Sequence, residues 1–309
     1  MFSDHGRCLA VALLCLFGLR RRGCGAMFGP QLLVETLSRV NPNPDKYGNL
    51  WQYHSRGDRH SKVACWGILF DLLLNCPPLV EHVRAGTVAF GINHEMRDFE
   101  QDRKKNLDLV ICTPSSAGVS KDKTFASLGE KYGIVLPSDA QDALAKLPLL
   151  PEAAVGAVRV ALEAKAAMTA HVRALPRLHD ELNSSHAAIH GASENALAVG
   201  FVMVNIASRF ASSDLNKQKI TGKKPLVFSN NKQPDDAIRV IDKVKEIKRK
   251  SASQGNGFDA MGILVVDCIN DGKTAVRLHT EKPAPQPQDI FHYESLIHRL
   301  AELYRVRFL

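Results

Sequence analysis

The chain alternates between apolar runs of strand length and segments whose apolar positions recur with a helical period. Five apolar runs are predicted as β-strands: residues 87–92, 107–112, 157–162, 197–206 and 262–268. Four segments with helical period are predicted as α-helices: residues 61–74, 166–183, 234–250 and 289–305. This alternation predicts an α/β or α+β protein.

The stretch 113–156 breaks the alternation, because serine, proline and lysine residues interrupt it. Only a short helical piece near residues 138–146 stands out within it. A long irregular stretch between two strands is typical of an insertion on the surface of a core. Residues 27–309 are therefore predicted to form a single domain that carries this surface insertion.

Residues 1–26 are predicted to be a poorly structured extension or leader outside the fold. Residues 8–19 form an apolar run as long as the core of a signal peptide, but a cluster of three arginines follows it. An export signal carries its positive charge before the apolar stretch, so this order disfavours export. Normal globular composition resumes at Met27, and the sequence leaves open whether translation starts there or at Met1.

The overall composition, 45% apolar and 23% charged among 309 residues, excludes collagen-like, fibrous and disordered classes. The seven cysteines are an odd number, thinly spread, and include no Cys-x-x-Cys pair. This argues against a disulfide framework and against a structural zinc site. No apolar run approaches the roughly 20 residues that cross a bilayer. We therefore expect a reduced, cytoplasmic protein with no membrane partner.

The net charge of +8 is unevenly distributed along the chain. Residues 214–250 contain eleven lysines and arginines against five acidic residues, a net charge of +6, while residues 1–26 contribute +3. The rest of the chain is nearly neutral. A neutral body with one basic segment is typical of a surface that contacts a phosphate backbone. A solvated helix preceded by a lysine-rich loop explains the charge of this segment equally well.

The motif Glu163-Ala164-Lys165 ends the apolar run of the strand predicted at 157–162. On a strand, alternation places Glu163 and Lys165 on the same face, whereas on a helix the two would point apart. A second Glu-x-Lys, at residues 246–248, falls in a charged segment with helical period, and its charged residues are predicted to be exposed on the surface without a specific role. The strand context therefore distinguishes the first copy.

Asp108 supplies a second carboxylate, on the strand predicted at 107–112, where its apolar neighbours indicate a specific role for the charge. Two carboxylates at adjacent strand ends bind one or two Mg²⁺ ions, which stabilise charge on a phosphodiester and lower the pKa of a bound water. A nearby lysine orients that water, offsets phosphate charge, or accepts a proton if burial lowers its pKa. This set of groups predicts in-line attack of water on phosphorus.

With Asp108 as the first acid and residues 163–165 as the (D/E)-x-K element, the sequence resembles the PD-(D/E)XK nuclease superfamily over residues 60–210. Leu107 stands where the motif has its proline. The resemblance implies a restriction-endonuclease-like α/β fold, with a central mixed sheet flanked by helices. The stretch 113–156 would then be an insertion between the two catalytic strands.

The same resemblance implies Mg²⁺-dependent cleavage of double-stranded DNA, with Mn²⁺ able to replace Mg²⁺, by a dimer or higher oligomer. Asp108, Glu163 and Lys165 would be the catalytic residues. Asp108, Glu163 and the backbone carbonyl of Ala164 would hold the metal. The helix predicted at 61–74 would precede the first core strand, and another helix would follow the motif.

Six further basic residues are candidate DNA contacts: Lys104, Lys105, Arg173, Arg177, Lys223 and Lys224. Lys104 and Lys105 precede Asp108 and are placed to hold phosphate near the metal, although they also suit an ordinary charged turn. Arg173 and Arg177 are spaced i, i+4, so one helical face presents both to a DNA backbone.

Two other features of the sequence have more than one interpretation. Asp71, in the helix predicted at 61–74, is equally suited to be an additional catalytic acid or a buried acid paired with a base. Several histidines follow the motif, but their spacing matches no standard zinc site and no cysteine joins them. We therefore do not expect zinc.

Three classes of function remain open. The first is a Mg²⁺-dependent DNA endonuclease, either a restriction enzyme or a bacterial defence nuclease, in which the basic segment 214–250 binds the duplex. The second is a DNA-binding protein on the same fold that does not cut. The third is an unrelated α/β interaction protein in which the motif arises by chance, and there we expect Asp108 and Glu163 to lie far apart.

Overall fold

The computed structural model describes residues 26–98, 102–251 and 255–309, so the extension predicted at 1–26 lies outside the described residues except for its last position. The described helices are α1 (Gly29–Leu37), α2 (Arg59–Asn75), α3 (Pro77–Arg84), α4 (Phe125–Lys131), α5 (Ser138–Ala145), α6 (His171–Ala192), α7 (Asp235–Lys245) and α8 (Tyr293–Phe308). The described strands are β1 (Ala89–Asp98), β2 (Arg103–Thr124), β3 (Pro151–Ala167), β4 (Leu197–Asn205), β5 (Arg209–Phe210), β6 (Ser229–Asn230), β7 (Ala260–Asp267) and β8 (Arg277–Leu278).

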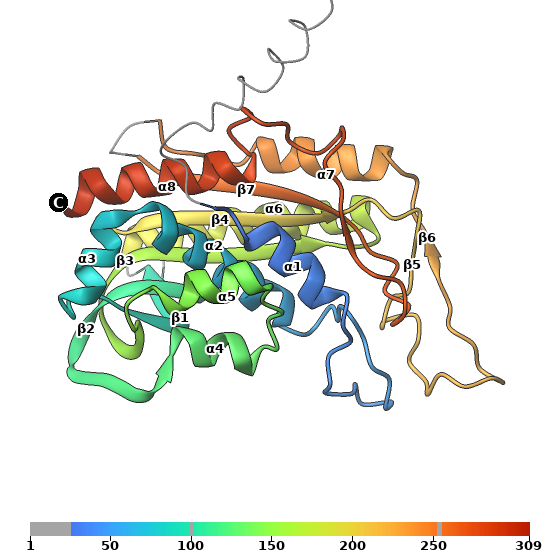
Figure 1. The fold of residues 1–309 in the computed structure, drawn as a ribbon. Coiled ribbons are helices and arrows are strands. Elements are labelled where there is room, and N and C mark those ends of the chain that lie inside the picture. The colour runs from blue at the N-terminus through green and yellow to red at the C-terminus, as the bar shows by residue number, and fades with distance from the viewer. Residues whose placement is uncertain (1–25, 99–101, 252–254) are drawn as a thin grey trace, which may run out of the picture.

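Six of these strands form one mixed sheet in the order β1-β2-β3-β4-β7-β8 (Figure 1). Strand β2 pairs antiparallel with β1 on one side and with β3 on the other, whereas β4 is parallel to β3 and β7 is parallel to β4. Strand β8 returns antiparallel to β7, and β5 pairs with β6 in a separate two-stranded sheet. The change from antiparallel to parallel pairing therefore falls at β3, which carries residues 163–165.

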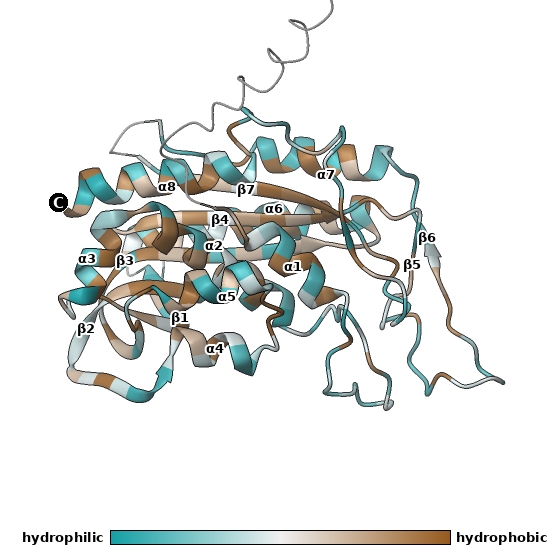
Figure 2. Cartoon of the chain, viewed as in Figure 1, coloured by the Kyte–Doolittle hydropathy of each residue, from teal (hydrophilic) through white to brown (hydrophobic). Residues whose placement is uncertain are grey.

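The central strand β4 is buried along its whole length, as expected for a strand covered on both faces. Its sequence is accordingly a nearly continuous apolar run rather than an alternating one. Figure 2 shows the same distribution, with hydrophobic strands between helices that alternate in hydropathy. Burial on both faces explains why the apolar runs, rather than strict alternation, predict these strands.

Helices cover both faces of the sheet. One face packs against α1, α2, α3 and α8, with Trp66, Phe70 and Tyr304 among its largest buried side chains. The other face packs against α6 and α7, through residues such as Leu182 and Val240. The α/β class and the central mixed sheet flanked by helices are thus confirmed.

Several predicted elements differ in length from the described ones, and the boundary that matters most lies next to the motif. The helix predicted from residue 166 begins only at His171, because β3 continues to Ala167. Ala170 then adopts a left-handed backbone conformation with φ of 50°, which redirects the chain into α6. Lys165 therefore lies within a strand, as the alternation argument requires.

The stretch 113–156 is not confined to the surface. Strand β2 extends through its first part, α4 and α5 follow, and β3 begins at Pro151. Phe125 at the start of α4 is buried and stacks on Trp66 of α2, with ring centroids 4.4 Å apart. Leu128 and Ala140 are buried in the same cluster. The helices between β2 and β3 thus form part of one core.

No single helix among the described residues has both the length and the hydropathy of a membrane span. Helices α2 and α3 pass such a test only when taken together, with a bend of 96° between them. Residues 61–73 of α2 are all buried within the protein.

Candidate active site

Asp108 and Glu163 lie next to each other across two paired strands. Leu109 of β2 pairs with Leu162 of β3 in antiparallel register, so Asp108 and Glu163 are the next residues on their strands. The regular pairing of β2 with β3 ends at this point. The amide of Ala164 donates a hydrogen bond of 3.0 Å to Oδ2 of Asp108. The structure therefore brings the two predicted acids and the motif backbone together.

Asp108 is held by three donors, of which the Ala164 amide is one. Ser61 Oγ donates to Oδ1 at 2.8 Å, and Lys62 Nζ donates to the same oxygen at 2.9 Å. Burial alone would raise the pKa of Asp108, but the Lys62 ammonium and the hydrogen bonds from Ala164 and Ser61 outweigh it and hold the pKa below its usual range. Asp108 is therefore ionised at neutral pH.

Glu163 is almost fully buried, with its side chain 2% exposed, and Lys165 Nζ lies 2.7 Å from its Oε1. Lys105 Nζ lies 3.9 Å from the same oxygen. Burial raises the pKa of Glu163; the Lys165 ammonium opposes this effect and the Asp108 carboxylate adds to it. Burial alone would lower the pKa of Lys165, but Glu163 outweighs it and raises that pKa. Lys165 is therefore protonated at neutral pH.

Glu181 of α6 connects this cluster to the surface. Its carboxylate lies 3.5 Å from Lys165 Nζ and 2.6 Å from Arg177 Nε. Its backbone carbonyl accepts a hydrogen bond of 3.4 Å from Lys105 Nζ. Helix α6 thus supplies the wall of the site that faces Glu163 and Lys165.

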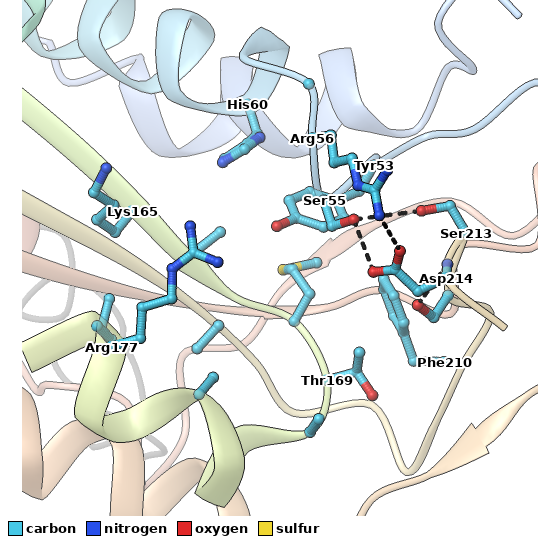
Figure 3. Close-up of a pocket in the computed structure, with 18 of the residues that line it drawn as sticks. Tyr53, Ser55, Arg56, His60, Lys165, Thr169, Arg177, Phe210, Ser213 and Asp214 are labelled. Carbon is cyan, nitrogen blue, oxygen red and sulfur yellow. Dashed lines mark hydrogen bonds and ion pairs between the residues drawn. The ribbon is translucent and has the colours of Figure 1, made fainter. Parts of the chain in front are cut away.

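Asp108 and Lys165 lie on the wall of a cavity of about 700 Å³. Strand β3, helices α2 and α6, and the loops around residues 53–58 and 210–215 enclose it (Figure 3). His60 of α2 lines the cavity across from Lys165, and its ring lies 4.7 Å from that of Tyr53. Burial lowers the pKa of His60 to about 4, so this imidazole is neutral at neutral pH.

The carboxylates retain free acceptor positions. Glu163 Oε2 is buried and has no hydrogen-bond partner among the described residues. Asp108 Oδ2 accepts only the bond from Ala164 within the described part of the chain, which leaves one of its lone pairs free. No group of three histidine, cysteine, aspartate or glutamate side chains suited to a metal occurs in the described ranges. Two carboxylates with free oxygens nevertheless fit Mg²⁺, which binds through one or two carboxylates and keeps several waters.

The six predicted DNA contacts fall into two groups. Lys105 approaches Glu163, and Arg173 and Arg177 line the cavity from α6. Lys104 instead extends from the β1–β2 hairpin and pairs with Glu95 at 3.0 Å. Lys223 and Lys224 are exposed in the loop between β5 and β6, where residues 221 and 224 form a turn. The structure thus brings Lys105, Arg173 and Arg177 to the acids and leaves the other three away from them.

Sequence reasoning missed Ser61, Lys62 and Glu181. The signal for Lys62 was present, because a lysine within the almost continuous apolar helix 61–74 cannot reach solvent and needs a buried partner. Glu181 carried no comparable signal, since a glutamate on an amphipathic helix is ordinary.

Asp71 does not join the site. Its carboxylate accepts hydrogen bonds of 2.8 Å from the amides of Phe28 and Gly29 and from the Tyr293 hydroxyl. These amides belong to the first turn of α1 and its N-cap, which leave their N–H groups without partners inside the helix. Asp71 is therefore a helix-capping residue and not an additional catalytic acid.

Comparison with known proteins identifies no relative of this chain: no protein-family model, curated protein or solved structure matches it. The arrangement of Asp108, Glu163 and Lys165 in this fold therefore carries the functional argument.

Proposed function

We propose that this protein is a Mg²⁺-dependent DNA endonuclease, either a restriction enzyme or a bacterial defence nuclease. One observation carries the proposal: Asp108, Glu163 and Lys165 meet at the end of the β2–β3 pairing and beside a large cavity. Two acids and a lysine so arranged supply metal ligands and a cation for a phosphodiester.

The order of elements around the site supports this proposal. Helix α2 precedes the antiparallel strands β1, β2 and β3, the motif lies on β3, and α6 follows before β4. The resemblance to PD-(D/E)XK nucleases implies a helix before the first core strand, a hairpin with the first acid, and a helix after the motif. The described elements follow this order, with α3 added before β1 and with α4 and α5 added between β2 and β3, which supports the proposal.

The residues present suit the metal that the resemblance implies. Glu163 Oε2 and the free lone pair of Asp108 Oδ2 are the available carboxylate ligands. The N–H and C=O of one strand residue point to the same side of the strand. Because the Ala164 N–H points toward Asp108, the Ala164 carbonyl is on the Asp108 side of β3 as well. When bound there, Mg²⁺ would stabilise phosphate charge and lower the pKa of a bound water.

The protein's own groups have distinct roles in this reaction. In it, water loses a proton to solvent and forms a new bond to phosphorus, while the bond to the leaving sugar oxygen breaks and that oxygen takes up a proton from solvent. Lys165, protonated because of Glu163, donates hydrogen bonds that orient the water and offset phosphate charge. Ser61 and Lys62 hold Asp108 ionised and in place. Arg173 and Arg177 add positive charge along the cavity wall, where the DNA backbone would lie.

The two other classes of function make different demands on the structure. An unrelated interaction protein places no constraint on Asp108 and Glu163, which nevertheless occupy adjacent positions. A DNA-binding protein that does not cut has no need of Lys165 beside Glu163. The adjacent acids and the lysine favour the nuclease.

Incubation of purified protein with supercoiled plasmid and Mg²⁺ tests the proposal. We expect cleavage that EDTA abolishes and that Asp108→Asn, Glu163→Gln and Lys165→Ala each reduce at least about a hundredfold. Glu246→Gln is the matched control for Glu163→Gln, because Glu246 belongs to the other Glu-x-Lys sequence and is exposed. DNA binding without cleavage by the wild-type protein would favour the non-cutting alternative. Absence of both would reject a nucleic-acid function.

A further inference from the structure

Two loops, residues 41–58 and 212–231, are joined into one unit beside the cavity, which we call the paired loops. Asn49 connects them: its Nδ2 donates to the carbonyl of Gln218 at 2.8 Å, and its Oδ1 accepts from the amide of Ile220 at 2.9 Å. The Asn49 side chain is buried. Because the donor and the acceptor of this buried side-chain amide are both bonded to the other loop, the amide fixes the two loops relative to each other.

The inner side of the paired loops lines the same cavity as Asp108 and Lys165. Arg56 and Asp214 lie there together, at the far end from Lys165 (Figure 3). Arg56 Nη2 lies 3.4 Å from Asp214 Oδ1, and Ser55 Oγ donates to Asp214 Oδ2 at 3.1 Å. A ligand that extends across this cavity from Asp108 and Lys165 therefore also reaches Arg56 and Asp214.

The Arg56–Asp214 pair is open to a ligand. Their side chains are 71% and 51% exposed. An exposed ion pair of this kind contributes little to stability, so separating it for a better partner costs little. The loops that carry it are nevertheless anchored, because Asn270 exchanges hydrogen bonds with both backbone groups of Tyr53.

As a pair, the two side chains have the chemistry of base recognition, because the Asp214 carboxylate beside the Arg56 guanidinium repels a phosphate. A guanidinium forms paired hydrogen bonds to O6 and N7 of guanine, and a carboxylate accepts from N4 of cytosine, both in the major groove. Lysines such as Lys223 and Lys224, exposed on the same loops, suit phosphates, which carry no sequence information. Arg56 and Asp214 together are thus complementary to a G·C base pair.

We propose that Arg56 and Asp214 read a G·C base pair in the DNA that this protein binds, so that the paired loops determine sequence preference. The inference rests on the proposed function in one respect: it requires a DNA duplex bound over the opening of the cavity, where the exposed side chains of Arg56 and Asp214 reach its major groove. It does not require that the duplex be cut.

Selection from a pool of duplexes with a randomised core tests this inference. The wild-type protein and its variants bind the pool in EDTA, bound duplexes are recovered by gel shift, and the recovered duplexes are sequenced. Arg56→Lys keeps the charge but removes the planar fork of donors, so it separates base reading from electrostatic attraction. Asp214→Asn removes the negative charge, and Lys223→Gln is the control for a phosphate contact.

We expect the wild-type protein to select G·C at one position at least. Arg56→Lys should lower the preference for guanine there by about tenfold or more, and Asp214→Asn should relax the same position or its neighbour. Lys223→Gln should weaken binding to all sequences alike. The same pool incubated with Mg²⁺ reports cleavage separately, so a protein that selects G·C without cutting would refute the nuclease and support the inference.

Two results would overturn the inference: wild-type selection with no G·C position, or unchanged selection by both Arg56→Lys and Asp214→Asn. A protein that binds no duplex at all would overturn this inference and the proposed function together. Thermal unfolding of each variant shows whether it is folded, and an exposed pair is expected to leave the transition nearly unchanged.

Discussion

Lys62 donates to both Oδ1 and the backbone carbonyl of Asp108, at 2.9 Å in each case. The Lys62 side chain is only 2% exposed, although it lies on a helix that is otherwise almost entirely apolar. A buried ammonium needs a buried carboxylate, and each of these two groups depends on the other. Helix α2 is thereby tied to β2 at the site.

Removing the Lys62 ammonium should affect both stability and activity. In Lys62→Met, the largely buried Asp108 loses its counter-charge, and we expect the free energy of unfolding to fall by about 3 kcal/mol. Cleavage should fall at least about tenfold, because the pKa of Asp108 would rise. Urea unfolding and plasmid cleavage measure the two effects.

Lys131→Met is the control for Lys62→Met, since Lys131 is an exposed lysine at the end of α4. It should change stability by less than about 0.5 kcal/mol. A Lys62→Met protein as stable as the control would show that the ion pair with Asp108 contributes nothing.

Arg173 and Arg177 should contribute to DNA affinity by binding phosphates. Both are exposed on α6 and line the cavity. Replacement of either by glutamine should weaken binding to all duplexes. The slope of log K against log salt should become shallower by about 0.9 for each phosphate that the protein no longer neutralises. Fluorescence anisotropy of a labelled duplex across a salt series measures this slope.

Arg84→Gln is a matched control for Arg177→Gln, because Arg84 is also an exposed helical arginine paired with a glutamate on its own helix. It lies on α3, away from the cavity lining. If Arg84→Gln and Arg177→Gln altered the salt slope equally, the effect would reflect net charge and not contact with DNA.

Asp71 should make the stability of the protein depend on pH. Burial raises its pKa from 3.8 to about 6, although three hydrogen bonds to its carboxylate act in the opposite direction. The folded state then keeps the proton up to about pH 6, whereas the unfolded chain releases it near pH 4. The stability contributed by this proton is present below about pH 4 and is lost as the pH rises to about 6.

The non-titrating variant Asp71→Asn isolates this contribution. Relative to the variant, the wild-type protein should lose about 3 kcal/mol of unfolding free energy between pH 4 and pH 7. Urea unfolding of both proteins across this range is the measurement. A difference that stays constant with pH would show that the Asp71 pKa is ordinary.

Gly67 is required where α1 and α2 cross. A Cβ added at Gly67 would lie 2.9 Å from the Cα of Gly29, which is backbone and cannot rotate away. Alanine normally stabilises a helix interior relative to glycine. We nevertheless expect Gly67→Ala to lower the free energy of unfolding by about 1 to 3 kcal/mol. Gly222→Ala, where a Cβ meets no atom within 4 Å, is the control and should be nearly neutral.

The core strands and the motif could be predicted from the sequence because they depend on local pattern. The buried run of β4 and the placement of Lys165 on a strand follow from the spacing of apolar residues. The pattern of apolar and polar residues could not show where β3 ends, because the end of β3 depends on the left-handed turn at Ala170. It also could not show that Phe125 packs on Trp66, because such packing joins segments far apart in the chain.

Part of the site was likewise accessible from sequence and part was not. The residue types of Asp108, Glu163 and Lys165, together with their strand context, led to the hypothesis of metal chemistry. Their meeting depends on the β2–β3 register, which the long stretch between the strands does not reveal. The partners Lys62 and Glu181 come from helices on opposite faces of the sheet, so only tertiary packing decides that Lys62 reaches Asp108 and that Glu181 reaches Lys165. Local pattern determined the strands and the side chains that they carry, and long-range packing decided which of the charged side chains lie close enough to neutralise one another.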